Sequence, residues 1–239
     1  MKWAGQCPDC AAWNTLAQTR IAPSQPGAGS AALPAGLETL PDDLASRHET
    51  GFAEFDRVLG GGLVPGAVVL LGGDPGVGKS TLLQQVSASL ASDLAVLYAT
   101  GEESLRQIGQ RSHRLGLASA DLKLLADTSL ENVLEQAAAC AARVLVIDSI
   151  QTMSSSGLPS APGSVAQLRE CVGRIVQYAK QTEVAVFIIG HVTKEGAIAG
   201  PRVVEHMVDT VLYFESDPAS RYTLIRSVKN RFGASGEMG

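Results

Sequence analysis

The sequence lacks any long apolar run, because no stretch of its 239 residues approaches the roughly 18 apolar residues that span a bilayer. Its first residues also lack the basic-then-apolar pattern of a secretory signal. Excess positive charge is missing too: 24 acidic residues outnumber 19 basic ones, and the net charge is −5. We therefore expect a cytoplasmic protein with no membrane partner and no broadly basic surface. A narrow basic channel is compatible with this charge.

Cysteine is scarce, with only four residues, and Cys140 and Cys171 lie in surroundings typical of small core residues. Cys7-Pro-Asp-Cys10 instead has the spacing of a zinc knuckle. A structural zinc ion takes four ligands, usually from two such pairs, and the sequence holds no second pair. The thioredoxin-like setting of a redox motif is also missing. We therefore expect half of a zinc finger, whose partial Zn²⁺ site stays empty.

Residues 22–36 consist almost entirely of Ala, Pro, Gly, Ser and Gln, a composition that buries too little apolar surface to order itself. This predicts a half zinc finger at 1–20, a flexible linker at 21–40 and one large domain at 41–239. In the large domain, short apolar runs alternate with segments of helical spacing, which indicates a mostly parallel sheet with helices on both faces. The strands predicted in this way are 67–71, 94–99, 122–126, 144–147 and 184–189.

Two further strands are predicted at 208–214 and 222–228, with no helix-length spacer between them. They are expected as late antiparallel additions, which completes the prediction of an α/β fold. By contrast, residues 151–165 are rich in Ser, Gly and Pro and offer little apolar area to anchor them. We expect this loop to be mobile in the absence of a ligand.

A phosphate-binding loop is the clearest motif: Gly, four free positions, Gly, Lys and then Ser or Thr. Glycines let backbone N–H groups approach phosphate oxygens, and the helix that follows adds its positive dipole end. Lys79 would hold the β- and γ-phosphates, and the Ser80 hydroxyl would bind Mg²⁺. The apolar strand before the loop and the helical spacing after it support a nucleotide site. Its expected residues are Gly73, Asp74, Pro75, Gly76, Val77, Gly78, Lys79, Ser80 and Thr81.

Polar residues follow three of the predicted strands, at the sheet edge where α/β proteins bind ligands. Asp148 would complete the Mg²⁺ site, directly or through water. Glu102 or Glu103 would orient or deprotonate the attacking water, and we favour Glu102, with the other as a first-turn helix acid. His191 is a candidate sensor of the γ-phosphate. A turn acid, a helix start and a structural histidine are the plainer interpretations of these residues.

The segment from Thr50 to Gly66, followed by the phosphate loop, resembles the RecA-like ATPases. Three further segments are similar to the bacterial RadA (Sms) family: Cys7-Pro-Asp-Cys10, Gly190-His-Val-Thr-Lys-Glu-Gly196 and Lys229-Asn-Arg-Phe-Gly233. The resemblance implies a RecA-like ATPase domain at 41–239 that forms hexameric rings on single-stranded DNA and uses ATP and Mg²⁺. It also implies recombinational repair and branch migration, with a RecA-type recombinase as partner.

That family carries a first Cys pair before the position of Cys7 and a Lon-protease-like domain after its RecA core. We therefore expect the present chain to be a truncated form or a fragment.

The resemblance also assigns roles beyond the phosphate loop. The loops at 151–165 and 193–205 are expected to face DNA in the ring channel, with Lys194 and Arg202 as candidate contacts. Lys229 and Arg231 follow a predicted strand two residues apart and would project to the same side. They could reach ATP bound by a neighbouring subunit as an arginine finger, or contact DNA directly.

Two alternatives to a DNA-stimulated ring motor remain open at this point. One is a KaiC-like ATPase with the same core, which acts on protein partners and would also suit the Glu102-Glu103 pair. The other is a nucleotide-gated binding module that hydrolyses little ATP. Stimulation of ATP turnover by DNA separates the motor from both.

Overall fold

The structure is a computed structural model that describes residues 47–117, 121–191, 203–216 and 222–239. Residues Asp43–Gly239 form one compact unit. Among the described residues, no helix is long and apolar enough to cross a membrane. The half zinc finger and the linker predicted for 1–40 lie outside the described residues and stay predictions.

Strands and helices alternate along the unit as the apolar runs predict, and each predicted strand is present within two residues. The helices are α1 (Ala53–Leu59), α2 (Lys79–Leu90), α3 (Leu105–Arg114), α4 (Leu130–Ala139) and α5 (Val165–Thr182). The strands are β1 (Val68–Gly73), β2 (Val96–Thr100), β3 (Lys123–Ala126), β4 (Val144–Asp148), β5 (Ala185–Ile189), β6 (Thr210–Ser216) and β7 (Thr223–Asn230).

The seven strands form one sheet in the order β3-β2-β4-β5-β1-β6-β7. All neighbours pair in parallel except β6 and β7, which are antiparallel to each other. The predicted α/β class, with a mostly parallel sheet and a late antiparallel pair, is thus confirmed. Within that pair, β6 joins the sheet parallel to β1, so only β7 runs against the other strands.

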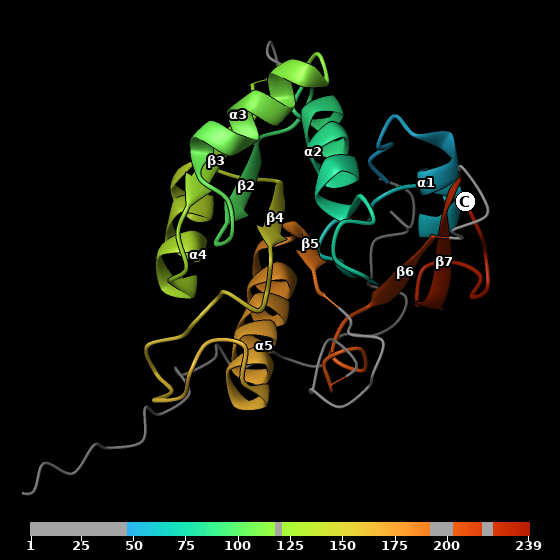
Figure 1. The fold of residues 1–239 in the computed structure, drawn as a ribbon. Coiled ribbons are helices and arrows are strands. Elements are labelled where there is room, and N and C mark those ends of the chain that lie inside the picture. The colour runs from blue at the N-terminus through green and yellow to red at the C-terminus, as the bar shows by residue number, and fades with distance from the viewer. Residues whose placement is uncertain (1–46, 118–120, 192–202, 217–221) are drawn as a thin grey trace, which may run out of the picture. The chain divides into compact units, whose positions relative to one another are not determined.

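Alternating strand residues supply two apolar layers, one on each face of the sheet. Side chains of α4 and α5 pack on one face, against alternate residues such as Leu70, Leu145 and Ile188. The helices α1, α2 and α3 lie on the other side of the sheet (Figure 1), and their side chains pack there with residues such as Leu71 and Phe187. Both faces are therefore covered, which explains why the central strands are apolar throughout.

Helix ends follow local chemistry. Gly60 ends α1 in the left-handed region at φ 89°. The spacing of Thr128 and Glu131 in the sequence predicts a capping box for α4, but the structure differs: Ser129 caps the helix, and its side chain accepts a hydrogen bond from the Asn132 N–H. The Glu131 carboxylate is instead committed to the loop after β4.

That loop is held by buried polar groups, which corrects the expectation that residues 151–165 have little to anchor them. The Gln167 amide of α5 donates to the carbonyls of Ser155, Leu158 and Ser160 at 3.1, 2.9 and 3.1 Å. The Ser155 hydroxyl donates to Glu131 at 2.9 Å, and Glu131 also pairs with Arg174. Low apolar content misled the prediction because polar side chains of two helices, distant in sequence, satisfy the loop backbone.

Glu131 makes the stability of the protein depend on pH in the acid range. Burial alone raises the pKa of Glu131, but its own backbone N–H, Arg174 and Ser155 outweigh burial and bring the pKa down to about 2. A depressed acid pKa adds stability that is present above the ordinary value near 4.5 and is lost as the pH falls through about 2. The free energy of unfolding should therefore fall between these pH values.

Glu131→Gln should remove this dependence and cost about 1 kcal/mol at neutral pH, because the ion pair is partly exposed. Urea unfolding at pH 7 and pH 3 measures both quantities. Glu135→Gln, an exposed acid of the same helix, is the matched control and should change little. Equal losses in the two variants at both pH values would contradict the assignment.

Candidate nucleotide site

The phosphate loop connects β1 to α2 and curves through three glycines with positive φ: 145° at Gly73, 79° at Gly76 and 109° at Gly78. Other residues rarely adopt these angles, so the loop conformation depends on glycine. A Cβ at Gly73 would also lie 2.9 Å from Phe214 of β6, whereas nothing lies within 4 Å of a Cβ at Gly76 or Gly78. The last two glycines therefore border open space, as a loop that receives phosphate requires.

Lys79, the first residue of α2, lies inside this loop and is only 3% exposed. Its Nζ donates to the carbonyl oxygens of Gly73 and Asp74, both at 2.7 Å. Burial lowers the pKa of Lys79, and the charges of Asp148, Asp74 and Glu102 partly offset that effect. The ammonium group is therefore enclosed by the phosphate loop and contacts two of its carbonyl oxygens.

Asp148 ends β4 beside the start of α2 and is 3% exposed. Its Oδ2 accepts a hydrogen bond from the Tyr98 hydroxyl at 2.5 Å. Burial raises the pKa of Asp148, whereas hydrogen bonds from Tyr98 and Ser80 lower it. The Ser80 hydroxyl and the Asp148 carboxylate are thus in contact, and hard oxygen ligands of this kind suit Mg²⁺.

Glu102 follows β2 and lies beside two groups from neighbouring strand ends. The Ser149 hydroxyl donates to its carboxylate, and His191 Nε2 lies 3.0 Å from its Oε1. The hydrogen bond with His191 is the largest cause that lowers the pKa of Glu102, followed, after an opposing effect of burial, by Ser149. The carboxylate is therefore ionised near neutral pH, the state that accepts a hydrogen bond from water.

Glu103 has a different environment from its neighbour, which the sequence did not reveal. Its carboxylate forms two contacts with Arg111 of α3, at 2.7 and 2.8 Å. Arg111 in turn donates to Gln84, a buried residue of α2. Glu103 is thus tied to the helix layer, whereas Glu102 contacts His191 at the sheet edge. This difference supports the choice of Glu102 as the residue that orients water.

An apolar cavity of about 300 Å³ adjoins the loop at Gly78 and Thr81. Val77, Phe214 and Ile225 line its walls, so it offers room for a flat apolar group beside the phosphates.

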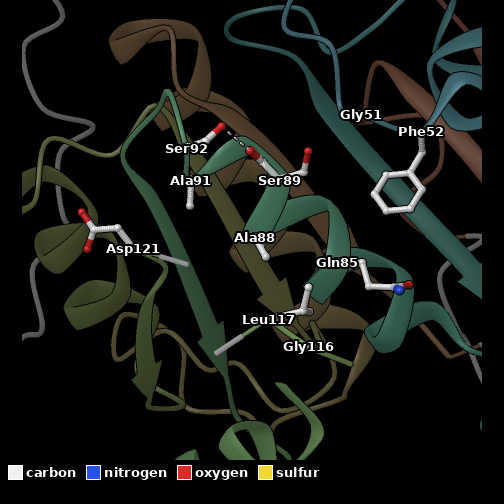
Figure 2. A pocket seen from close by; sticks show the side chains of 10 residues that line it. All are labelled: Gly51, Phe52, Gln85, Ala88, Ser89, Ala91, Ser92, Gly116, Leu117 and Asp121. Atoms are coloured by element: carbon white, nitrogen blue, oxygen red, sulfur yellow. Dashed lines mark hydrogen bonds between the residues drawn. The ribbon is translucent and has the colours of Figure 1, made fainter. Parts of the chain in front are cut away.

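A larger cavity of about 620 Å³ lies beside the C-terminal half of α2. Figure 2 shows Gln85, Ala88 and Ser89 of α2 along that cavity. None of the predicted site residues lines it, so its size does not bear on the phosphate chemistry.

The segment Lys229-Asn-Arg-Phe-Gly233 lies at the amino ends of the parallel strands, because β7 is antiparallel to them. The phosphate loop lies at their carboxyl ends. Lys229 Nζ donates to the carbonyls of Glu205, His206 and Val208, so it is engaged within the chain. Arg231 is 58% exposed, with its NH1 group 3.5 Å from Oδ1 of buried Asp209. Both cations point toward residues 205–209, and Arg231 is the more accessible.

The rest of this segment is attached to the N-terminal part of the domain. The Asn230 amide donates to the carbonyls of Val58 and Leu59, which end α1. The carbonyl of Phe232 accepts a hydrogen bond from Arg47 at 2.8 Å. These contacts hold the segment against α1 and the residues that precede it.

Sequence reasoning missed three residues that complete the site: Tyr98, Ser149 and Arg111. A polar side chain inside an apolar strand was the available signal for Tyr98, and the position after Asp148 was the signal for Ser149. No local signal pointed to Arg111.

Four predicted site residues lie outside the described residues, and their roles stay predictions: Cys7, Cys10, Lys194 and Arg202. Among the described residues, no cluster of three or more His, Cys, Asp or Glu could hold a metal ion.

Comparison with known proteins adds independent evidence. The family model of the AAA domain matches residues 36–197. A DNA repair protein RadA of Pseudomonas aeruginosa is 55% identical over 244 residues, which cover 100% of this chain and 54% of that protein. The RadA proteins of Listeria monocytogenes and Escherichia coli are 49% and 46% identical, again over 100% of this chain and 53% and 54% of their own lengths. The chain spans about half the length of these curated relatives.

Proposed function

The chain belongs to the AAA domain family and is similar along its whole length to RadA proteins, and from this membership we propose that it is a cytoplasmic ATPase of DNA repair. One observation carries the proposal: Lys79 at the start of α2, Asp148 at the end of β4 and Glu102 just after β2 lie at the same end of the parallel strands, close enough for the two carboxylates to act on the Lys79 ammonium group. These are the three types of group that ATP hydrolysis requires. The RadA names of the relatives supply the link to DNA repair.

ATP binds in this proposal with its phosphates on the loop and its base in the adjoining cavity beside Phe214. Lys79 leaves the carbonyls of Gly73 and Asp74 for phosphate oxygens. Ser80 and Asp148 hold Mg²⁺, which neutralises charge on the phosphates when it is bound. The oxygen donors and the buried position fit this ion. No residue in the described parts of the chain is assigned to Zn²⁺.

Glu102 orients the attacking water, and His191 senses the nucleotide through Glu102. The Gln151 amide donates to the carbonyl of His191 at 3.2 Å, so the loop after β4 and the strand end of β5 are connected. A change at Glu102 can therefore reach both candidate DNA loops, 151–165 and 193–205. Lys194 and Arg202 in the second of these are the proposed DNA contacts.

The finer proposal is a hexameric ring motor on single-stranded DNA that promotes branch migration beside a RecA-type recombinase. The position of Arg231 supports an assembly of more than one chain. The five residue steps from Val68 to Gly73 along β1 span roughly 16 Å. Arg231 lies near the start of β1, whereas the phosphate loop follows the end of that strand. Arg231 therefore cannot reach the phosphates of its own chain, and it can assist hydrolysis only in a neighbouring subunit.

Mixing two inactive variants tests this role. Arg231→Ala protein mixed with Lys79→Ala protein should regain part of the ATPase activity, because mixed interfaces join an intact loop to an intact Arg231. Arg226→Ala is the matched control, since Arg226 lies on β7, the strand that Arg231 follows, and pairs with Glu215; this variant should be active without mixing. An absence of recovery in rings shown to be mixed would favour a direct DNA contact for Arg231.

The general proposal is tested by ATP hydrolysis measured with and without single-stranded DNA at several salt concentrations. A DNA-stimulated ATPase should turn over ATP faster with DNA, and the stimulation should weaken as salt rises. Unstimulated turnover would favour an ATPase that acts on protein partners, as KaiC does. Binding of ATP without turnover would favour a nucleotide-gated module.

A further inference from the structure

Tyr98 is a polar residue in the middle of an otherwise apolar part of β2. It is fully buried and packs with Leu83 and Val86 of α2 and Ile108 of α3. In the parallel pairing of β2 and β4, Tyr98 lies opposite Val146, and Thr100 lies opposite Asp148. Because side chains alternate along a strand, Tyr98 and Asp148 share the face of the sheet on which α2 begins. The tyrosine ring thus spans one diagonal step toward the carboxylate.

The hydroxyl of Tyr98 is committed to Asp148. The distance from the hydroxyl oxygen to Asp148 Oδ2 is 2.5 Å, at the short end of the range for a hydrogen bond from a hydroxyl to a carboxylate. A phenol keeps its proton at neutral pH, so Tyr98 is the donor in this bond and the carboxylate is the acceptor.

Asp148 needs such a donor because it is nearly inaccessible to solvent, so the protein itself must supply hydrogen bonds to its carboxylate oxygens. Tyr98 and Ser80 are the hydrogen-bond donors that act on its carboxylate. Two donors on a group with two oxygens restrict its rotation, in the way that outer partners orient metal ligands.

We propose that Tyr98 is a positioning residue of the metal site: its hydroxyl fixes the Asp148 carboxylate in the orientation that meets Ser80 and that Mg²⁺ requires. This inference rests on the proposed binding of Mg²⁺ with ATP. It assigns Tyr98 no contact with the nucleotide or the metal. Its effect is therefore confined to metal-dependent steps, whereas nucleotide contacts of the phosphate loop itself are unaffected.

A buried tyrosine hydroxyl needs a hydrogen-bond partner for stability alone, so the test must separate positioning from packing. Tyr98→Phe keeps the ring and removes only the hydroxyl. Tyr213→Phe is the matched control, because the Tyr213 hydroxyl also donates to a carboxylate, Glu205, at 2.5 Å. The two substitutions remove the same type of bond, but only one of them acts on Asp148.

The measurement is the affinity of a fluorescent ATP analogue, first in EDTA and then across a Mg²⁺ series. In EDTA the two variants and the unsubstituted protein should bind the analogue equally. In the series, Tyr98→Phe should need on the order of tenfold more Mg²⁺ for half of the metal-dependent gain, and Tyr213→Phe should need no more. Saturating Mn²⁺, which binds such sites more tightly, should restore Tyr98→Phe.

Each outcome decides between the possibilities. An unchanged Mg²⁺ requirement in Tyr98→Phe, with a metal-dependent gain in the unsubstituted protein, overturns the inference and leaves the proposed function standing. An equal rise in both variants assigns the effect to stability and also overturns the inference. No metal-dependent gain in the unsubstituted protein would overturn the proposed nucleotide site and this inference together. Loss of stability in Tyr98→Phe does not hide the answer, because thermal unfolding with the analogue, with and without Mg²⁺, reports the same difference.

Discussion

Lys79→Ala is expected to abolish ATP hydrolysis, with a loss of about 10²–10³-fold or more, as when a single preorganised donor is removed from an active site. Lys79 is the buried cation of the phosphate loop, and its two present partners are carbonyl oxygens that phosphate oxygens can replace. Alanine leaves the transferred phosphoryl group without this charge. The measurement is steady-state release of inorganic phosphate under saturating Mg²⁺ and ATP.

The matched control for this prediction is Lys123→Ala, because Lys123 is an exposed lysine of the edge strand β3. It should retain normal turnover. A far-ultraviolet circular dichroism spectrum should show that Lys79→Ala has kept its fold. Near-normal hydrolysis by folded Lys79→Ala protein would refute the proposed nucleotide site and with it the proposed function.

Glu102→Gln is expected to bind ATP and not turn it over, with a loss of about 10²–10⁴-fold in the hydrolysis rate, the range that a positioned acid or base contributes. The amide keeps the size of the side chain and can still accept from Ser149, but it no longer carries the charge that attracts a proton of water. His191 loses its carboxylate partner at the same time. Binding of a fluorescent ATP analogue and phosphate release separate the two effects.

Glu103→Gln serves as the comparison, since it changes the adjacent residue by the same atoms. Its carboxylate contacts Arg111, so this variant should weaken the attachment of α3 and keep most of the hydrolysis rate. If Glu103→Gln stops hydrolysis and Glu102→Gln does not, the assignment of the pair is reversed. A loss in both variants would indicate that the segment acts as a unit, and a double variant would then show no further loss.

The phosphate loop and the succession of strands and helices along the chain were determined by the sequence itself, because both depend on neighbouring residues. The glycines at 73, 76 and 78 permit the observed backbone angles locally. Apolar runs buried on both faces identify parallel strands without knowledge of their partners. Asp148 was predicted as a site residue for the same reason, since it directly follows such a run. Local conformation and burial are the properties that a short stretch of sequence records.

Other features depend on contacts between segments that are distant in the sequence, so only the tertiary structure revealed them. The roles of Glu102 and Glu103 diverge because His191 and Arg111 approach from different elements. The loop after β4 is anchored by the Gln167 amide and by Glu131, which composition alone could not indicate.

Tyr98 meets Asp148, and Arg231 lies far from its own phosphate loop, because of strand pairing and strand direction. A side-chain hydrogen bond joins residues through space, and nothing in the local sequence at either partner specifies the other. The sequence therefore determined which groups the protein carries and the local shape of the loop. The tertiary structure alone decided which carboxylate meets which donor, because strand order and direction set those distances.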